Sequence, residues 1–398
     1  MEIGTRHAYG VVLLAAGVAV AGVLARGFPA MDGRAGPAPV VARGQHVRGN
    51  QIVNARGQAV RLTGFNNSGA EYACVEGWGI FDTPDTTMTT AIVAAMAAWT
   101  GANAVRVPVS EQCWLGLPGI RRAYAGARYR HAIERYVSLL DSRGFAVILD
   151  LAGTAPGAEK PANQEEMPDA HSIAFWRSAA AVFRGNTSVL FDLFNEPWPG
   201  NGTGTPGAWA CWRDGGCVQT SRNGGERYRA VGMGQLIAAV RGTGARNIVI
   251  AEGLRYAETV DRWLEYRPRD PAGNLIASVH VYSFNECSTV SCYNGAMKRV
   301  AAQVPLLIGE LGPDLTVPYT SALDSSCPRG DVGRTGFDSA LLSWARQNKV
   351  SWTAWTWNPS NDCWSLVRNF EGAPTSRYGA IIKSALRSQG YPPPRNRG

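Results

Sequence analysis

The stretch FDLFNEPW, Phe191–Trp198, decides the fold of this chain. It overlaps an apolar run, Val189–Phe194, whose only charged residue is an aspartate. Such a run predicts a strand that is buried on both faces of a parallel sheet. Glu196 follows the run at once, and Pro197 stops the hydrogen-bonding ladder behind it. Because α/β proteins bind ligands at the carboxyl ends of parallel strands, a carboxylate is expected at the binding edge.

A second carboxylate lies in the same setting. The apolar run Val304–Gly309 predicts another buried strand, and Glu310 ends it. A glycosidase that retains anomeric configuration needs one carboxyl group to protonate the leaving oxygen and another to attack the anomeric carbon. Asn195, directly before Glu196, adds an amide that can bind the sugar 2-hydroxyl. One strand-end glutamate would equally fit a salt bridge, whereas two of them indicate catalysis.

Strand-like runs recur along most of the chain. There are eight: Val60–Phe65, Asn103–Val107, Phe145–Leu151, Val189–Phe194, Asn247–Ala251, Ile276–Val281, Val304–Gly309 and Ser351–Trp357. Helical patterns lie between them, at Thr86–Trp99, Tyr129–Ser142, Ser172–Phe183, Arg227–Val240, Asp338–Arg346 and Tyr378–Leu386. This alternation predicts an α/β fold, a (β/α)8 TIM barrel, with both glutamates at one mouth. A doubly wound sheet is the alternative, but no glycine-rich phosphate loop follows the first run.

The composition excludes some classes of partner. The 398 residues carry a net charge of +8, but only 18% are charged and no long Lys/Arg run is present. Nucleic-acid binders usually concentrate basic residues on one face, so no nucleic acid is expected as a partner. The 13 Trp residues indicate flat apolar ligand faces such as sugar rings, or a large core. We expect a monomer that works without a metal or cofactor.

The N-terminal segment predicts export. Val11–Ala25 is an unbroken apolar run with the length of a signal-peptide core, and it is short for a membrane span, which needs about 20 residues. An uncleaved signal anchor is the alternative, so we expect a secreted protein or one held at the membrane by this segment. Gly27–Ala42 predicts a Gly/Pro/Ala-rich linker. The predicted organisation is residues 1–45 for targeting and linker, 46–392 for one catalytic barrel, and 393–398 for a tail.

Cysteines in an exported chain predict disulfides, although the sequence alone leaves their connectivity open. All of them follow predicted strands, which places them in loops on one face of the barrel: Cys74, Cys113, Cys211, Cys217, Cys287, Cys292, Cys327 and Cys363. Cys211–Cys217 and Cys287–Cys292 are close enough to close single loops. Cys74–Cys113 and Cys327–Cys363 would then tie neighbouring loops together. A zinc site is the competing interpretation, which these spacings do not favour because no His pair lies nearby.

The motifs together resemble glycoside hydrolase family 5, the cellulase-type barrel glycosidases. The resemblance runs from about Val60 to Trp364 and is strongest in LFNEP (Leu193–Pro197) and IGELG (Ile308–Gly312). Supporting motifs are VRVPV (Val105–Val109), HVY (His280–Tyr282) and WTWNP (Trp355–Pro359). The family pattern implies a retaining β-glycosidase, most specifically an endo-β-1,4-glucanase acting on a β-linked polysaccharide or oligosaccharide. Glu196 would be its general acid/base and Glu310 its nucleophile.

The resemblance also implies roles for residues around the two glutamates. Asn195 would bind the 2-hydroxyl, and Arg106 would lie beneath Glu310 and favour its ionised form. His280 and Tyr282 would line the catalytic centre, with Tyr282 bonded to the nucleophile. The plainer interpretations are that Arg106 pairs with a structural acid and that His280 is a satisfied core histidine.

Tryptophans are expected to contact the sugar. The family match implies that Trp357 forms the floor on which the reacting sugar stacks, although Trp355 shares its strand face by periodicity. Tryptophans in the candidate loops form sugar subsites or only pack: Trp78, Trp114, Trp198, Trp209, Trp212 and Trp364.

One position departs from the family pattern. After the third strand the family usually has LDLH, whereas this chain has LDLA, with Ala152 in the histidine position and Gly153 and Thr154 behind it. The change removes a hydrogen-bonding group and leaves room at the centre. It keeps open a non-catalytic carbohydrate-binding protein on the same scaffold, and also a glycosidase specific for mannan, xylan or a glycolipid.

Overall fold

The computed structural model describes residues 44–157, 160–161, 163–200, 204–313, 336–360 and 362–388. The predicted signal or anchor segment, most of the linker and the tail lie outside these residues. Among the helices of the described part, none is both long and apolar enough to cross a membrane.

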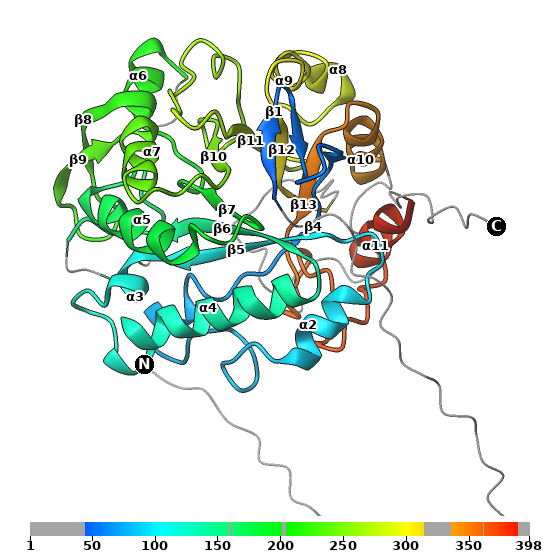
Figure 1. Cartoon of the computed structure of the whole chain (residues 1–398), viewed down its shortest axis with the longest axis horizontal. Helices are drawn as coiled ribbons and strands as arrows, with labels where there is room; N and C mark the ends of the chain where they lie inside the picture. The colour runs from blue at the N-terminus through cyan, green and yellow to red at the C-terminus, as the bar shows by residue number, and fades with distance from the viewer. Residues whose placement is uncertain are drawn as a thin grey trace, which may run out of the picture. The chain divides into compact units, whose positions relative to one another are not determined.

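Eight parallel strands close into a barrel in chain order (Figure 1). They are β4 (Thr63–Asn66), β5 (Ala104–Ser110), β6 (Ala146–Gly153), β7 (Val189–Asp192), β10 (Val249–Glu252), β11 (Leu275–Val281), β12 (Leu306–Leu311) and β13 (Ser351–Ala354). Each overlaps one of the eight predicted runs, so the predicted (β/α)8 barrel is confirmed. The runs were mostly apolar because a parallel strand is covered by helices on one side and by the barrel interior on the other.

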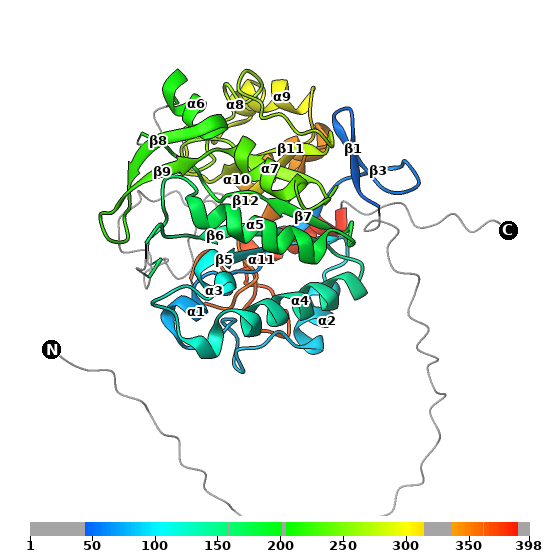
Figure 2. The ribbon, with the colours of Figure 1, turned by 60° about the vertical axis from the view of Figure 1, so that its left-hand side comes forward.

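Helices surround the strands, as Figure 2 shows for α4 and α5 beside β5, β6 and β7. The helices are α1 (Ala73–Glu76), α2 (Thr90–Ala97), α3 (Glu111–Leu115), α4 (Ala127–Ser142), α5 (Ala170–Phe183), α6 (Pro206–Asp214), α7 (Met233–Arg241), α8 (Val290–Tyr293), α9 (Ala296–Ala301), α10 (Phe337–Gln347) and α11 (Tyr378–Ser388), with a 3-10 turn at Arg122–Tyr124. Local capping defines several starts. The Thr89 side chain, for example, accepts from Ile92 N at 3.2 Å at the start of α2.

The predicted helix at Arg227–Val240 is wrong in its first part. Residues Arg227–Val231 form strand β9, which pairs antiparallel with β8 (Gly215–Thr220) in a hairpin, and helix α7 begins only at Met233. Side chains in β9 alternate between exposed and buried, and Gly232 precedes the helix. The hairpin therefore belongs to the long connection between β7 and β10.

The barrel interior contains two layers. The lower layer is apolar and consists of Leu62, Ala104, Ala146, Ile148, Leu190, Ile248, Ile250, Ile276 and Leu307. The upper layer is polar and consists of Asn66, Arg106, Asp150, Asp192, Glu252, His280 and Glu310. Residues two apart share a strand face, so Ile148 and Asp150 occupy neighbouring layers of one strand.

A small antiparallel sheet closes the lower end of the barrel. Its strands, in order, are β1 (His46–Arg48), β2 (Gln51–Val53) and β3 (Ala59–Val60). Ile52 and Val60 from this sheet belong to the same apolar cluster as the lower layer. In the described part of the chain, the lower end of the barrel is therefore covered by this sheet, and the polar layer lies at the upper end, where the strands terminate.

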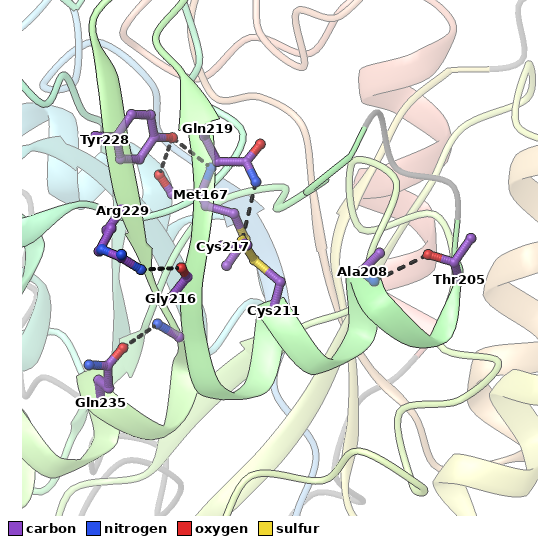
Figure 3. The surroundings of a disulfide bond; sticks show 11 residues. Met167, Thr205, Ala208, Cys211, Gly216, Cys217, Gln219, Tyr228, Arg229 and Gln235 are labelled. Atoms are coloured by element: carbon purple, nitrogen blue, oxygen red, sulfur yellow. Dashed lines mark hydrogen bonds between the residues drawn. A yellow bond between two sulfur atoms is a disulfide. The ribbon is translucent and has the colours of Figure 1, made fainter.

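Three predicted disulfides are confirmed: Cys74–Cys113, Cys211–Cys217 and Cys287–Cys292. Their Cα atoms are 6.3, 5.7 and 5.4 Å apart, within the usual range for a bridge. The first joins α1 to α3, the second joins α6 to β8 (Figure 3), and the third closes the loop that leads into α8. Cys363 is also disulfide-bonded, and its predicted partner Cys327 lies outside the described residues.

Candidate active site

Arg106 lies at the centre of the upper layer. Its guanidinium contacts four carboxylates, at 2.8 Å to Glu310, 2.8 Å to Glu252, 2.9 Å to Asp192 and 3.0 Å to Asp150. Burial alone would lower the pKa of Arg106, but these charges raise it well above its usual value. Arg106 therefore pairs with structural acids and also lies against the predicted nucleophile.

Glu310 faces the interior because strand β12 is irregular. Val279 of β11 is opposite Ile308, whereas the next residue, His280, is opposite Glu310, so Gly309 is an extra residue on β12. Such a bulge bends a strand and re-aims the side chain that follows it. Leu307 and Glu310 therefore both point inwards, although three positions separate them.

Gly309 is required at this bulge. A Cβ at this position would lie 2.7 Å from Ser278 Oγ and 3.0 Å from His280 Nε2, closer than packing permits. Its carbonyl oxygen accepts hydrogen bonds from Asn66 Nδ2 at 3.0 Å and from Thr353 Oγ1 at 2.5 Å. The extra residue is thus held by side chains from two other strands, β4 and β13.

Glu196 follows β7 in an unusual backbone conformation. Its φ is 53°, in the left-handed region that residues other than glycine rarely adopt. Gln164 Nε2 donates to its carbonyl oxygen at 3.0 Å and to that of Asn195 at the same distance. The side chain is 18% exposed, so the carboxyl group can be reached from the barrel mouth.

His280 lies between the two glutamates. Its Nδ1 is 2.8 Å from Glu196 Oε1 and 3.6 Å from Glu310 Oε2. One oxygen of each carboxylate and Nδ1 all lie within 4.8 Å of one another. Tyr282 Oη donates to Glu310 Oε2 at 2.5 Å. These four residues, predicted from separate strand ends, are therefore brought together.

The environment gives Glu196 the pKa of a proton donor. Burial raises its pKa, His280 lowers it, and Glu310 and Glu252 raise it, with a result of about 7. His280 itself is buried, which lowers its pKa, but Glu252 and Glu310 raise it well above 6.5. At neutral pH the ring is therefore an imidazolium, and Glu196 is poised near the pH where general acids and bases work best.

Asn195 is oriented by the same network. Its Oδ1 accepts from Arg106 Nη2 at 2.9 Å. Because the amide oxygen is used in this way, the amide NH2 group is the part that can donate to a sugar hydroxyl.

The stacking role predicted for Trp357 does not fit the structure. Trp357 is fully buried, with its ring 4.6 Å from Phe65 and 4.8 Å from Trp99. Trp355 is half-buried instead. Strand β13 ends at Ala354, so the alternation that would give both tryptophans one face does not continue past it. Trp355 is therefore the better candidate for the sugar floor.

The loop tryptophans divide into packing and accessible residues. Trp114, Trp209 and Trp212 are fully buried and only pack. Trp78 is 54% exposed, and Trp364 is half-buried with its ring 5.2 Å from Tyr282.

Trp198 is covered from two sides. Its ring stacks on Tyr256 at 4.6 Å, and the Arg222 guanidinium lies 4.1 Å from its centroid. Arg222 comes from the tip of the β8–β9 hairpin, whose neighbouring Ser221 is held by buried Glu165. Tyr256 and Arg222, which the sequence did not single out, are thus the accessible members of this stack.

The position of the missing histidine lies close to Glu71. Ala152 and Gly153 are half-buried at the end of β6, and a Cβ on Gly153 would lie 2.8 Å from Ser110 Cβ and 3.1 Å from the Glu71 carbonyl oxygen. The pKa of Glu71 is raised to about 8, chiefly by burial; hydrogen bonds to backbone N–H groups lower it, the charge of Glu310 raises it and Arg106 lowers it. Glu71 is therefore a further carboxyl group whose titration is coupled to the site.

Some clusters of side chains in the described part of the chain have the composition of metal ligands. They are Glu111 with Asp169 and His171, Glu196 with His280 and Glu310, and Asp150 with Asp192 and Glu252. In the last the Arg106 guanidinium already supplies the cation, and in the second the charged His280 does. For Glu111 and Asp169, burial raises the pKa of both, so a shared proton can neutralise one of them. These groups fit proton and guanidinium partners better than a metal.

Comparison with known proteins shows which family this chain belongs to. A family model described as cellulase (glycosyl hydrolase family 5) matches residues 53–361. A β-glucanase from Saccharophagus degradans, solved with cellotetraose, superposes with a TM-score of 0.64 at 17% identity, covering 90% of this chain and all of that one.

Two further solved structures show the range of relatives. The catalytic domain of the major endoglucanase from Xanthomonas campestris pv. campestris has a TM-score of 0.60 at 18% identity, covering 86% of this chain and 99% of that one. The catalytic domain of a mannanase from Streptomyces sp. SirexAA-E has a TM-score of 0.58 at 20% identity, covering 86% and 90%. At these identities the likeness concerns the fold.

Proposed function

The chain belongs to the cellulase family, glycosyl hydrolase family 5, and on this premise we propose that it is a retaining β-glycosidase, most specifically an endo-β-1,4-glucanase. The observation that carries the proposal is the pair Glu196 and Glu310, whose nearest oxygens lie within 4.8 Å. Retaining enzymes hold their carboxyl groups about 5–5.5 Å apart and inverting enzymes about 6.5–9.5 Å. The short separation leaves no room for a water molecule opposite the leaving group, so the carboxylate itself attacks.

In the first step a Glu310 oxygen forms a bond to the anomeric carbon while the bond to the glycosidic oxygen breaks. Glu196 transfers its proton to that oxygen, and the leaving sugar departs as an alcohol. Arg106 and Tyr282 hydrogen-bond the two Glu310 oxygens and hold the carboxylate in position. The Asn195 amide donates to the 2-hydroxyl, a contact that strengthens in the transition state.

In the second step water loses a proton to Glu196 and attacks the anomeric carbon, and Glu310 leaves as a carboxylate. The charge of Glu310 is one of the causes that raise the pKa of Glu196. Once Glu310 is esterified this charge is gone, so the pKa of Glu196 falls and the residue becomes a base. Glu196 and Glu310 therefore alternate in carrying the negative charge during the cycle: Glu310 carries it before the first step, and Glu196 carries it in the glycosyl-enzyme.

Cello-oligosaccharides are the proposed substrate. The relatives solved with cellotetraose or described as endoglucanases support it, and the mannanase relative supports a mannan as the second candidate. A panel of β-glucan, mannan and xylan polymers, assayed for reducing-end release, distinguishes them. Proton NMR of the first product then tests the mechanism, since an inverted anomer would overturn the retaining assignment.

A non-catalytic carbohydrate-binding role is the second candidate, favoured by the missing histidine at Ala152. Calorimetric binding of cello-oligosaccharides with no reducing ends released over days would establish it. Release of reducing ends that disappears in Glu310→Ala would exclude it.

We also propose that the protein is exported and monomeric. The disulfides support export, because such bridges persist in oxidising compartments. Mass spectrometry of the secreted protein tests cleavage after the N-terminal apolar run, and an intact N-terminus in the membrane fraction would establish the anchored alternative. Light scattering tests the monomer.

A further inference from the structure

We propose that Glu252 is a positioning residue that keeps His280 doubly protonated and thereby sets how readily Glu196 gives and takes its proton. This inference rests on the proposed function, in which Glu196 is the acid/base. Glu252 ends strand β10 and is completely buried. Its contacts are with Arg106, His280 and the main chain of Glu196, so its effect on the reaction passes through these neighbours.

The two oxygens of Glu252 serve different partners. Oε1 accepts from Arg106 Nη2 at 2.8 Å and from His280 Nε2 at 3.0 Å. Oε2 accepts from the backbone N–H of Glu196 at 2.6 Å. One buried carboxylate therefore joins the guanidinium, the imidazole and the acid/base main chain.

When Glu196 is ionised, the contacts on His280 call for two ring protons. Nε2 faces Glu252 and Nδ1 faces Glu196 at 2.8 Å. A neutral imidazole has a single N–H and can donate to only one of them. With an ionised carboxylate on each side, the imidazolium satisfies both. Burial raises the pKa of Glu252, but the charges of His280 and Arg106 hold it at about 2, so this carboxylate stays ionised.

Other charged and titratable groups around the ring come from the neighbouring strands. Together with Glu252 they are Arg106, Asp192, Glu196, Tyr282 and Glu310. Of these groups, all in the described part of the chain, Glu252 is the ion-pair partner of Nε2, whereas Glu196 and Glu310 both lie on the Nδ1 side. Glu252 is therefore the group that fixes the Nε2 proton.

The second contact of Glu252 restrains the backbone. A left-handed conformation costs a residue such as Glu196 about 1–2 kcal/mol and persists only where surrounding contacts impose it. The bond from Glu196 N–H to Glu252 Oε2 is such a contact. It directs the Glu196 side chain towards His280 rather than away from the centre.

Loss of the charge at residue 252 acts on Glu196 in opposite directions. Removing a nearby carboxylate lowers the pKa of Glu196, whereas neutralising His280 raises it. His280 bonds the Glu196 side chain itself and Glu252 bonds only its main chain, so the loss of the imidazolium dominates. The pKa of Glu196, about 7 in the native protein, is expected to rise in Glu252→Gln.

The test combines kinetics with NMR on the full-length protein. In Glu252→Gln the alkaline limb of kcat/KM for cellopentaose should move up by about one pH unit. Hydrolysis of the glycosyl-enzyme, measured with an activated aryl cellobioside, should slow about tenfold because Glu196 is held less well as a base. The ring nitrogens of His280 should show an imidazolium in the native protein at pH 7.5 and a neutral ring in the variant.

Asp150→Asn is the matched control, because Asp150 is equally buried and contacts Arg106 at 3.0 Å through the same Nη2 atom. It should leave both the alkaline limb and the His280 signals in place. Equal shifts in the two variants, or a neutral His280 in the native protein at pH 7.5, would overturn the proposal. The NMR comparison needs no turnover, so it separates failure of this inference from failure of the glycosidase assignment. If Glu252→Gln does not fold, the native His280 signals alone decide.

Discussion

The lower and upper layers of the barrel interior use the same strands for opposite purposes. In the lower layer Ile148 belongs to an apolar cluster, whereas two residues further along the same strand Asp150 contacts Arg106. Burying the lower layer stabilises the fold by about 25 cal/mol per Å² removed from water. Burying a guanidinium with four carboxylates carries a desolvation cost that their attraction only partly offsets. The lower, apolar layer, which stabilises the fold, and the upper, polar layer, which contains the proposed catalytic groups, are thus separated along the strands.

The largest expected effect is in the upper layer. Glu310→Ala removes the nucleophile and should lower kcat about 10⁵-fold or more, equivalent to about 7 kcal/mol of activation free energy. Azide should restore turnover in this variant by taking the place of the carboxylate. Because Arg106 keeps three carboxylate partners, chemical denaturation should show no loss of stability. A clearly destabilised variant would contradict the division between layers.

The next largest effect is in the lower layer and is expected on stability rather than on activity. Ile148→Ala leaves a cavity among fully buried side chains and should lower the free energy of unfolding by about 2–5 kcal/mol. Activity per folded molecule should stay within about twofold of native, since Ile148 belongs to the apolar layer and supplies no polar group to the upper one. Urea unfolding and active-site titration measure the two quantities. A strong loss of kcat in folded protein would show that the layers are coupled.

A smaller effect is expected at the edge of the upper layer. Tyr282→Phe removes one hydrogen bond to the ionised Glu310, a contact class worth about 1.5–3 kcal/mol, so kcat should fall about 10- to 100-fold. The effect should fall on kcat more than on KM, because the bond acts on the reacting carboxylate. Phe284→Ala, close by at a ring distance of 5.3 Å from Tyr282, is the control and should leave the chemical step nearly intact.

The smallest effect concerns proton binding in the upper layer. Glu196 must be protonated for the first step, and burial raises its pKa to about 7, so kcat/KM should fall about tenfold per pH unit above that value. This decrease of kcat/KM at alkaline pH should be absent in Glu196→Gln when the variant is assayed with an activated aryl glycoside. The lower layer has no titratable group, so Ile148→Ala should keep the native pH profile.

Much of this arrangement could be predicted from the sequence. Continuous apolar runs located all eight strands, and the placement of Glu196 and Glu310 directly after two of them identified the candidate carboxyl pair. Three disulfides followed from cysteines placed after strands. These features depend on local patterns, which a single sequence contains.

Other features depend on contacts between strands, which a single sequence does not contain. Glu252 also ends a run, but only the register of β10 against its neighbours brings it to both Arg106 and Glu196. Trp355 and Trp357 could not be distinguished without knowing that β13 ends at Ala354. The helical spacing of Arg227–Val240 was misleading because pairing with β8 outweighed it in the first five residues.

The bulge at Gly309 has a consequence for how this site is encoded. Along an even pleat the interior would receive positions 307, 309 and 311, and the carboxylate at 310 would face the helices. The proposed nucleophile reaches the interior because the bulge takes up the additional residue that separates it from Leu307. Straightening the bulge without changing the sequence would leave every side chain in place and yet direct Glu310 into the apolar shell. The backbone bulge, which cannot be recognised from any single side chain, therefore determines this site as much as the identity of its glutamates does.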